Sequence, residues 1–231
     1  IGDKVHLFYQ SYGNRENDAI CHATSADGIH FDRNPTNPIF RPTGDWTIGR
    51  AIDADTIPFK GEMLLYFATR DPSFKTQMIG VAAAPLDSGF VRDAWEQRAD
   101  FPVLKPELDW EKECIEASSV IVRKDRLYMF YGGAYNTEPQ QIGVALSEDG
   151  IHWRRMSDQP LLPNGEPGSW NEHEAGHPGV FTDDDGKQYL FYQGTNNKGK
   201  TWYLSKMQIE WDEEDRPYLI RPEDSKTFRL K

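Results

Sequence analysis

One short unit recurs four times along this chain of 231 residues, about 60 residues apart. Each copy is a polar turn followed by an apolar stretch rich in aromatic residues, and the four stretches are Val5–Tyr9, Met63–Phe67, Leu127–Tyr131 and Gln188–Tyr192. A tight turn before such a stretch is typical of a β-hairpin. No long segment shows helical periodicity. The spacing suits a four-stranded blade, so we predict an all-β fold, a β-propeller with one blade for each copy.

The segments that follow these stretches extend each blade. A third strand is predicted at Ile20–Ser25 in the first copy and at Ile142–Ser147 in the third. The near-duplicate sequences Asp27–Phe31 and Asp149–Trp153 come next, and we interpret them as turns. Near the C-terminus, Lys206–Trp211 is expected to form an outer strand.

The repeat boundaries predict one propeller domain that covers residues 1–231. A partial blade is expected at residues 1–45, and further blades at about 46–108, 109–166 and 167–231. The first copy begins at its hairpin turn, so its innermost strand is missing. About four blades are therefore visible, and an N-terminal segment outside this sequence or a partner chain is expected to close the propeller.

A Trp precedes three predicted innermost strands, and these residues are Trp46, Trp110 and Trp170. We expect them to pack between adjacent blades. Stacking against a sugar is the alternative, and Trp110 is the candidate for it.

Charge and composition exclude several classes of partner. The net charge of −11 and the pI near 5.0 argue against binding to nucleic acid or to anionic membranes, which requires clustered cations. No apolar run approaches the roughly 18 residues of a membrane span. No signal peptide is recognised and Ile1 is not an initiator Met, so localisation stays open, with secretion or the periplasm favoured over the cytoplasm.

Polar residues stand at the starts of the predicted innermost strands. They are Asp53 or Asp55, Glu116 and His177, each among small or apolar neighbours. In a propeller these positions converge at one mouth of the axis. A carboxylate beside a buried strand is costly unless it is used, and two carboxylates in a partly dry pocket acquire separated pKa values. Glycoside hydrolysis needs such a pair, whereas the alternative is that these acids bind backbone amides or a structural cation.

Four segments of the chain resemble glycoside hydrolase families 43 and 32, and family 43 most closely. Asp53–Phe67 is similar to the segment that carries the transition-state-stabilising Asp of both families, and Glu116–Tyr131 to the segment of their general-acid Glu. Ala175–His177 resembles the start of the family 43 blade that carries a His on the propeller axis. His6–Gln10 looks like a short motif common to both families. The resemblance covers nearly the whole chain.

The resemblance implies a five-bladed propeller that cleaves glycosidic bonds in oligosaccharides or polysaccharides containing arabinose, xylose, fructose or galactose. It implies that Glu116 donates the proton and that Asp53 positions the substrate and adjusts the pKa of the acid, with Asp55 in reserve. The catalytic base of the family is an Asp on the innermost strand of the first blade, and this chain has no equivalent.

The resemblance also suggests further ligands of the site. It associates His177 with a metal ion or water on the propeller axis, so His177 is both a substrate-binding and a metal candidate, and calcium is the expected structural ion. No cofactor is required for the chemistry. Arg50 stands three residues before Asp53, where family 32 places an Arg directly before the acid. Arg50 and Glu113 are the remaining candidates for substrate contacts.

Two other functions stay open on the sequence. A related propeller could perform phosphorolysis of mannosides, which would require Arg and His residues clustered at the mouth. A non-catalytic carbohydrate-binding propeller would explain the missing base.

Overall fold

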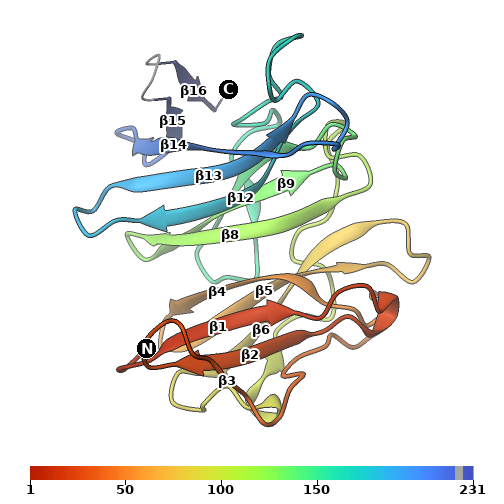
Figure 1. The fold of residues 1–231 in the computed structure, drawn as a ribbon, viewed down its shortest axis with the longest axis vertical. Helices are drawn as coiled ribbons and strands as arrows, with labels where there is room; N and C mark the ends of the chain where they lie inside the picture. Colours follow the sequence, from red (N-terminus) through yellow and green to blue (C-terminus); the bar gives the residue numbers. More distant parts are fainter. Residues whose placement is uncertain (222–225, 231) are drawn as a thin grey trace. The chain divides into compact units, whose positions relative to one another are not determined.

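A computed structural model describes residues 1–221 and 226–230, and the chain divides into two compact units. The first unit is Ile1–Lys105 and the second is Pro106–Lys231. Both are built from antiparallel strands (Figure 1), and within the described residues the helical elements are two short 3-10 turns, η1 (Arg15–Asn17) and η2 (Arg92–Ala94). The predicted all-β fold is confirmed.

The first unit contains two sheets. The strands of the first sheet are β1 (Val5–Gln10), β2 (Ile20–Ser25) and β3 (Asp32–Arg33), paired in that order. The strands of the second are β4 (Ile52–Phe59), β5 (Glu62–Arg70), β6 (Gln77–Pro85) and β7 (Glu96–Gln97). Consecutive strands are neighbours throughout, as in a propeller blade.

The second unit repeats this plan. Its first sheet is β8 (Ile115–Arg123), β9 (Arg126–Gly133), β10 (Gln141–Ser147) and β11 (Arg154–Arg155). Its second sheet is β12 (Glu174–Thr182), β13 (Gln188–Thr195), β14 (Tyr203–Trp211), β15 (Pro217–Ile220) and β16 (Thr227–Arg229). The described residues therefore form four blade-like sheets, and a fifth blade stays a prediction.

Tight two-residue hairpins join β4 to β5 and β8 to β9. Lys60 and Gly61 have φ of 47° and 89°, and Lys124 and Asp125 have φ of 48° and 59°. Two successive residues with positive φ make the two-residue turn whose twist matches a β-hairpin. The turns at Asp27 and Asp149 are also confirmed, because each carboxylate accepts the backbone N–H groups two and three residues later.

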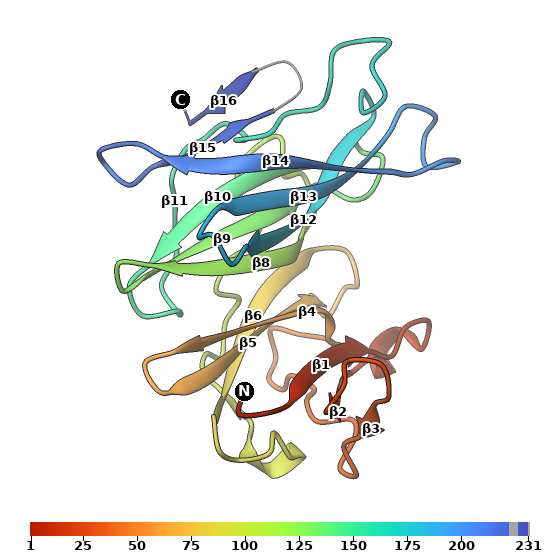
Figure 2. The ribbon, with the colours of Figure 1, turned by 60° about the vertical axis from the view of Figure 1, so that its left-hand side comes forward.

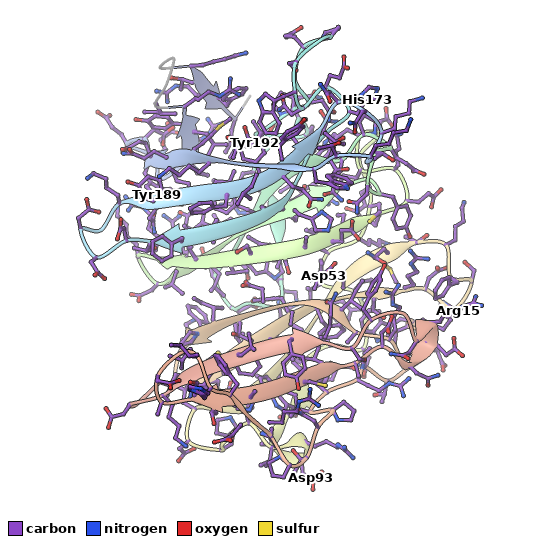
Figure 3. The ribbon with its side chains drawn as sticks, viewed as in Figure 1. Arg15, Asp53, Asp93, His173, Tyr189 and Tyr192 are labelled. Carbon is purple, nitrogen blue, oxygen red and sulfur yellow. The ribbon has the colours of Figure 1, made fainter. Side chains whose placement is uncertain are left out.

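Within each unit the two sheets share a core. In the second unit β12 lies beside β8 (Figure 2), and in the first unit β1 lies beside β4. Aromatic side chains of the repeated stretches fill the space between the sheets, and Tyr128, Phe130 and Tyr192 belong to one buried cluster of the second unit. Tyr192 comes from β13 and is labelled in Figure 3. The repeated aromatic stretch is thus the part of each blade that holds it to its neighbour.

The three Trp residues contact glycines of their own sheets. Gly133 and Gly143 lie so close to the Trp110 ring that a Cβ on either would overlap it, and the Trp110 ring also stacks on Tyr131 at 5.9 Å. Glycines of β6 and β13 meet Trp46 and Trp170 in the same way. Each Trp ring therefore packs on glycines of its own sheet. The prediction of packing between adjacent blades did not include these contacts.

Neither Cys21 nor Cys114 forms a disulfide within the described part of the chain. No helix among the described residues is long and apolar enough to span a membrane.

Candidate functional site

The innermost strands β4, β8 and β12 each carry a β-bulge near their first residue. The pairing with the next strand shifts between Ile52 and Asp55, between Glu116 and Ser119, and between Gly176 and Gly179. The first bulged residue has positive φ in every case, with 52° at Asp53, 50° at Ala117 and 47° at His177. Bulges re-aim side chains and are common beside active sites.

The bulges correct the expectation that the three polar residues share one position. Asp53 and His177 are equivalent, because each is the first bulged residue of its strand. Glu116 is the last paired residue before its bulge, opposite Gly132, and Ala117 takes the position equivalent to Asp53. A sequence pattern places residues by count along the chain, whereas the bulge decides which residue is turned out of the ladder.

Glu116 lies at the start of β8 and is 6% exposed. Its Oε1 lies 3.9 Å from Nε2 of His177, which comes from β12 of the neighbouring sheet. The structure therefore brings together two of the predicted site residues within the second unit.

Gln140 links Glu116 and His177, and sequence reasoning missed it. Its side chain is fully buried just before β10. Its Nε2 donates to Oε1 of Glu116 at 2.8 Å and to the carbonyl of Ala134 at 2.9 Å. Its Oε1 accepts the backbone N–H of His177 at 2.9 Å and lies 2.9 Å from Nδ1 of the same residue. One carboxamide thus contacts both site residues.

A second pair of polar side chains continues this network behind His177. Gln193 Nε2 lies 3.0 Å from His177 Nδ1 and donates to Oε1 of Glu174 at 2.9 Å. Glu174 is fully buried and also accepts the N–H of Thr137 at 2.7 Å. Burial raises the pKa of Glu174, and these two hydrogen bonds oppose the rise.

The surroundings of His177 do not by themselves fit a calcium ion. Ca²⁺ takes about six to eight oxygen ligands. Across residues 1–221 and 226–230, no group of three or more His, Cys, Asp or Glu side chains could hold a metal ion. His177 Nδ1 is engaged by two glutamines, which leaves Nε2 facing Glu116. The predicted metal-binding role of His177 stays a prediction.

In the first unit, Asp53 lies half-buried at the bulge of β4 (Figure 3). Its backbone N–H donates to Oε1 of Gln10, the last residue of β1. Asp55 follows the bulge, opposite Tyr66 of β5, and is also half-buried. Asp53 rather than Asp55 therefore takes the position equivalent to His177.

Arg50 lies two residues before β4 and is 4% exposed. Its Nη2 lies 3.4 Å from the buried carboxylate of Asp18, and its Nε has no hydrogen-bond partner among residues 1–221 and 226–230. Three guanidinium groups lie around the ring of Phe74. The Cζ atoms of Arg70, Arg15 and Arg50 are 4.5, 5.4 and 5.8 Å from the ring centre. Arg15 is exposed and labelled in Figure 3. No sequence pattern predicts this cluster, because Arg15, Arg50 and Arg70 lie far apart along the chain.

The other predicted contact residues lie on the segment before β8. Glu113 is half-buried in the turn two residues before the strand. Trp110 is also half-buried, and its Nε1 donates to the carbonyl of Asp158 at 3.1 Å. Their roles toward a substrate stay predictions.

The profile of glycosyl hydrolases family 43 matches residues 1–217 of the chain. The chain belongs to this family. Among curated proteins, this family 43 chain is similar to a β-1,2-mannobiose phosphorylase of Thermoanaerobacter sp. (strain X514), with 31% identity over 129 residues. That alignment covers 49% of the chain and 40% of the phosphorylase, so the chain spans less than half of that relative.

Solved structures of low identity share the fold of this family 43 chain. An endo-1,4-beta-xylanase from Bacteroides thetaiotaomicron VPI-5482 is 19% identical, with a TM-score of 0.74. The match covers 99% of this chain and 73% of the xylanase chain. A thermostable family-43 glycoside hydrolase is 20% identical with the same TM-score of 0.74, covering 100% of this chain and 73% of its own. The predicted propeller fold is confirmed by this likeness.

Proposed function

We propose that this family 43 chain belongs to a glycosidase in which Glu116 is the general acid. The observation that carries the proposal is the environment of Glu116, a nearly buried carboxylate that accepts an amide N–H from Gln140 and lies 3.9 Å from His177. In its protonated form Glu116 gives its proton to the glycosidic oxygen as the bond to the anomeric carbon breaks. The sugar that leaves then departs as an alcohol.

Asp53 is the second carboxylate of the proposal. Its bulge turns it out of the β4 ladder at the position equivalent to His177. The proposed role of Asp53 is to hold the substrate and adjust the pKa of the acid. Asp55, Arg50, Glu113, Trp110 and His177 are the proposed substrate contacts.

The finer features of the proposal rest on the family resemblance. The complete protein is a five-bladed propeller that acts on oligosaccharides or polysaccharides containing arabinose, xylose, fructose or galactose. The carboxylate that activates water lies outside these 231 residues. The proposed chemistry requires no cofactor. A structural calcium ion at His177 would need oxygen ligands that the described residues around His177 do not group together.

The test is Glu116→Gln in the full-length protein, assayed on 4-nitrophenyl arabinofuranoside, xyloside and galactoside. Gln keeps the shape of the side chain but carries no acidic proton, so we expect kcat to fall by about 100- to 10,000-fold. The matched control is Glu138→Gln, an exposed Glu in the loop between β9 and β10, which should keep full activity. Unchanged turnover by folded Glu116→Gln would refute the role of Glu116. Saturable sugar binding without turnover by the wild-type protein would instead favour a carbohydrate-binding propeller.

Phosphorolysis is the second candidate function, and two observations favour it. The curated relative is a β-1,2-mannobiose phosphorylase. Arg15, Arg50 and Arg70 lie around the Phe74 ring, and the exposed guanidinium group of Arg15 is the one we propose to meet a phosphate ion. In this reaction phosphate replaces water as the attacking group at the anomeric carbon, and Glu116 still protonates the oxygen that leaves.

The two reactions differ in their dependence on phosphate. With β-1,2-mannobiose as substrate, phosphorolysis predicts a rate that rises with inorganic phosphate and the appearance of mannose 1-phosphate. Hydrolysis predicts free mannose alone at a rate that phosphate does not change. Arg15→Gln should raise the KM for phosphate in the first case and leave turnover unchanged in the second.

A further inference from the structure

A glutamine fixes the bulged residue at a sheet junction in each unit. In the first unit Gln10 Oε1 accepts the backbone N–H of Asp53, and in the second unit Gln140 Oε1 accepts the backbone N–H of His177. Asp53 and His177 are the equivalent residues with positive φ. Positive φ is uncommon for residues other than Gly, although Asp and His adopt it more readily than most. The hydrogen bond to the backbone N–H helps to hold each bulge in this conformation.

The two glutamines contact the bulged residue from different parts of their sheets. Gln10 is the last residue of β1, whereas Gln140 lies just before β10. Gln10 is opposite Ile20 in β2, and its equivalent in the second unit is Gly132, which is opposite Ile142 in β10. A Cβ at Gly132 would lie 2.9 Å from the Cδ of Gln140. Gln140 therefore occupies the space that the missing side chain of Gly132 leaves. It takes over the hydrogen bond that Gln10 makes in the first unit.

The amide nitrogen of Gln140 makes two further contacts. Its Nε2 donates to Oε1 of Glu116 and also to the carbonyl of Ala134. A carbonyl can only accept and a backbone N–H can only donate, so Ala134 and His177 N–H together fix which end of the amide is nitrogen.

The same orientation places the ring of His177 between two amides. Nδ1 of His177 lies 2.9 Å from Oε1 of Gln140, which can only accept, and 3.0 Å from Nε2 of Gln193, which can only donate. Nε2 of the ring lies 3.9 Å from Oε1 of Glu116.

We infer that Gln140 is a positioning residue for the general acid. This inference rests on the proposed role of Glu116. The single amide orients the carboxyl group of Glu116 and holds the bulge of His177, whose Nε2 faces the acid. A displacement of an acid by a fraction of an ångström weakens proton transfer to the leaving oxygen, while substrate binding is largely unchanged.

The test is Gln140→Met in the full-length protein, because Met fills a similar volume without hydrogen-bonding groups. We expect kcat to fall about 10- to 100-fold at an unchanged KM. The loss should be larger for phenyl than for 2,4-dinitrophenyl glycosides, because a good leaving group needs little protonation. Gln140→Glu, which keeps the acceptor for His177 but cannot donate to Glu116, should also lose activity. The matched control is Gln141→Met at the next residue, which should retain activity. A loss for Gln140→Met that is the same for every leaving group would mark Gln140 as merely structural and overturn the inference.

A second measurement does not depend on turnover. The ¹⁵N shifts of the His177 backbone amide and ring in labelled protein should change in Gln140→Met, because Oε1 of Gln140 contacts both. Unchanged shifts overturn the inference even if Glu116 proves to be the acid. Shifts that change as expected in a protein whose wild type has no turnover overturn the proposed function instead.

Discussion

Gly176 and Gln140 are in such close contact that a Cβ on Gly176 would overlap the Oε1 of Gln140. Gly176 is the last paired residue of β12 before the bulge that presents His177. The glycine therefore allows the side chain of Gln140 to pass between two sheets of the second unit. The position is constrained by this contact and not by backbone conformation.

Gly176→Ala should therefore destabilise the protein by about 1–3 kcal/mol, because a methyl group added to a filled space must displace Gln140. The measurement is the urea midpoint of unfolding. Gly179→Ala is the matched control in the same strand, since nothing lies within 4 Å of its missing Cβ. Equal effects of the two substitutions would contradict the close contact.

The buried ion pair of Glu111 and Arg155 should be the most sensitive electrostatic contact of the second unit. Glu111 is fully buried, accepts two hydrogen bonds from Arg155 at 2.7 and 2.8 Å, and accepts a third from the hydroxyl of Tyr131 at 2.8 Å. Arg155→Met would leave the carboxylate buried without its counter-charge, at a cost of about 3–5 kcal/mol.

Thermal or urea unfolding measures this loss. The exposed pair of Lys187 and Asp185 is the control, and Lys187→Met should change the stability by less than about 1 kcal/mol. A loss for Arg155→Met as small as that of the control would refute the prediction.

His22 should make the stability of the first unit depend on pH. Burial, with a smaller effect of His6, lowers the pKa of His22 from 6.5 to about 4. Its Nδ1 accepts from Asn34 at 3.1 Å and its Nε2 lies 3.0 Å from Nδ1 of His6, an arrangement that suits two neutral rings. The unfolded chain binds a proton near pH 6.5 and the folded chain only near pH 4. Stability is therefore complete above pH 6.5 and falls as the pH is lowered from 6.5 to 4.

The expected loss is about 1–3 kcal/mol over this pH range. Urea unfolding at several pH values would measure it, and His22→Gln should flatten this part of the profile. A wild-type slope that His22→Gln leaves unchanged would assign the pH dependence to other groups.

Trp110 should contribute to stability whether or not it also contacts sugar. Its ring lies on Gly133, Gly143 and Tyr131, so Trp110→Ala would open a cavity and cost about 3–5 kcal/mol. Trp110→Phe keeps part of this packing, so its KM separates the two roles. An increased KM at unchanged kcat would support sugar stacking, and full stability of Trp110→Ala would contradict the packing.

The sequence by itself determined the blades. Stretches such as Leu127–Tyr131 are apolar and follow tight turns, so they form buried strands of hairpins. Each hairpin pairs strands that are neighbours along the chain, and this sets the strand order within each sheet. It also selected Glu116 and His177, since polar residues among small and apolar neighbours stand out in a repeat.

Only the tertiary structure decided how these residues are arranged. The place of a β-bulge in a strand cannot be found by counting residues along the sequence. Glu116 precedes the bulge of its strand, while Asp53 and His177 lie on the bulges of theirs. Gln140 resembles any polar residue of a loop until Gly132 is seen to leave space for it. A repeat specifies contacts between neighbours in the chain, whereas the site is made by contacts between sheets, where a side chain from one strand can replace a side chain missing from another.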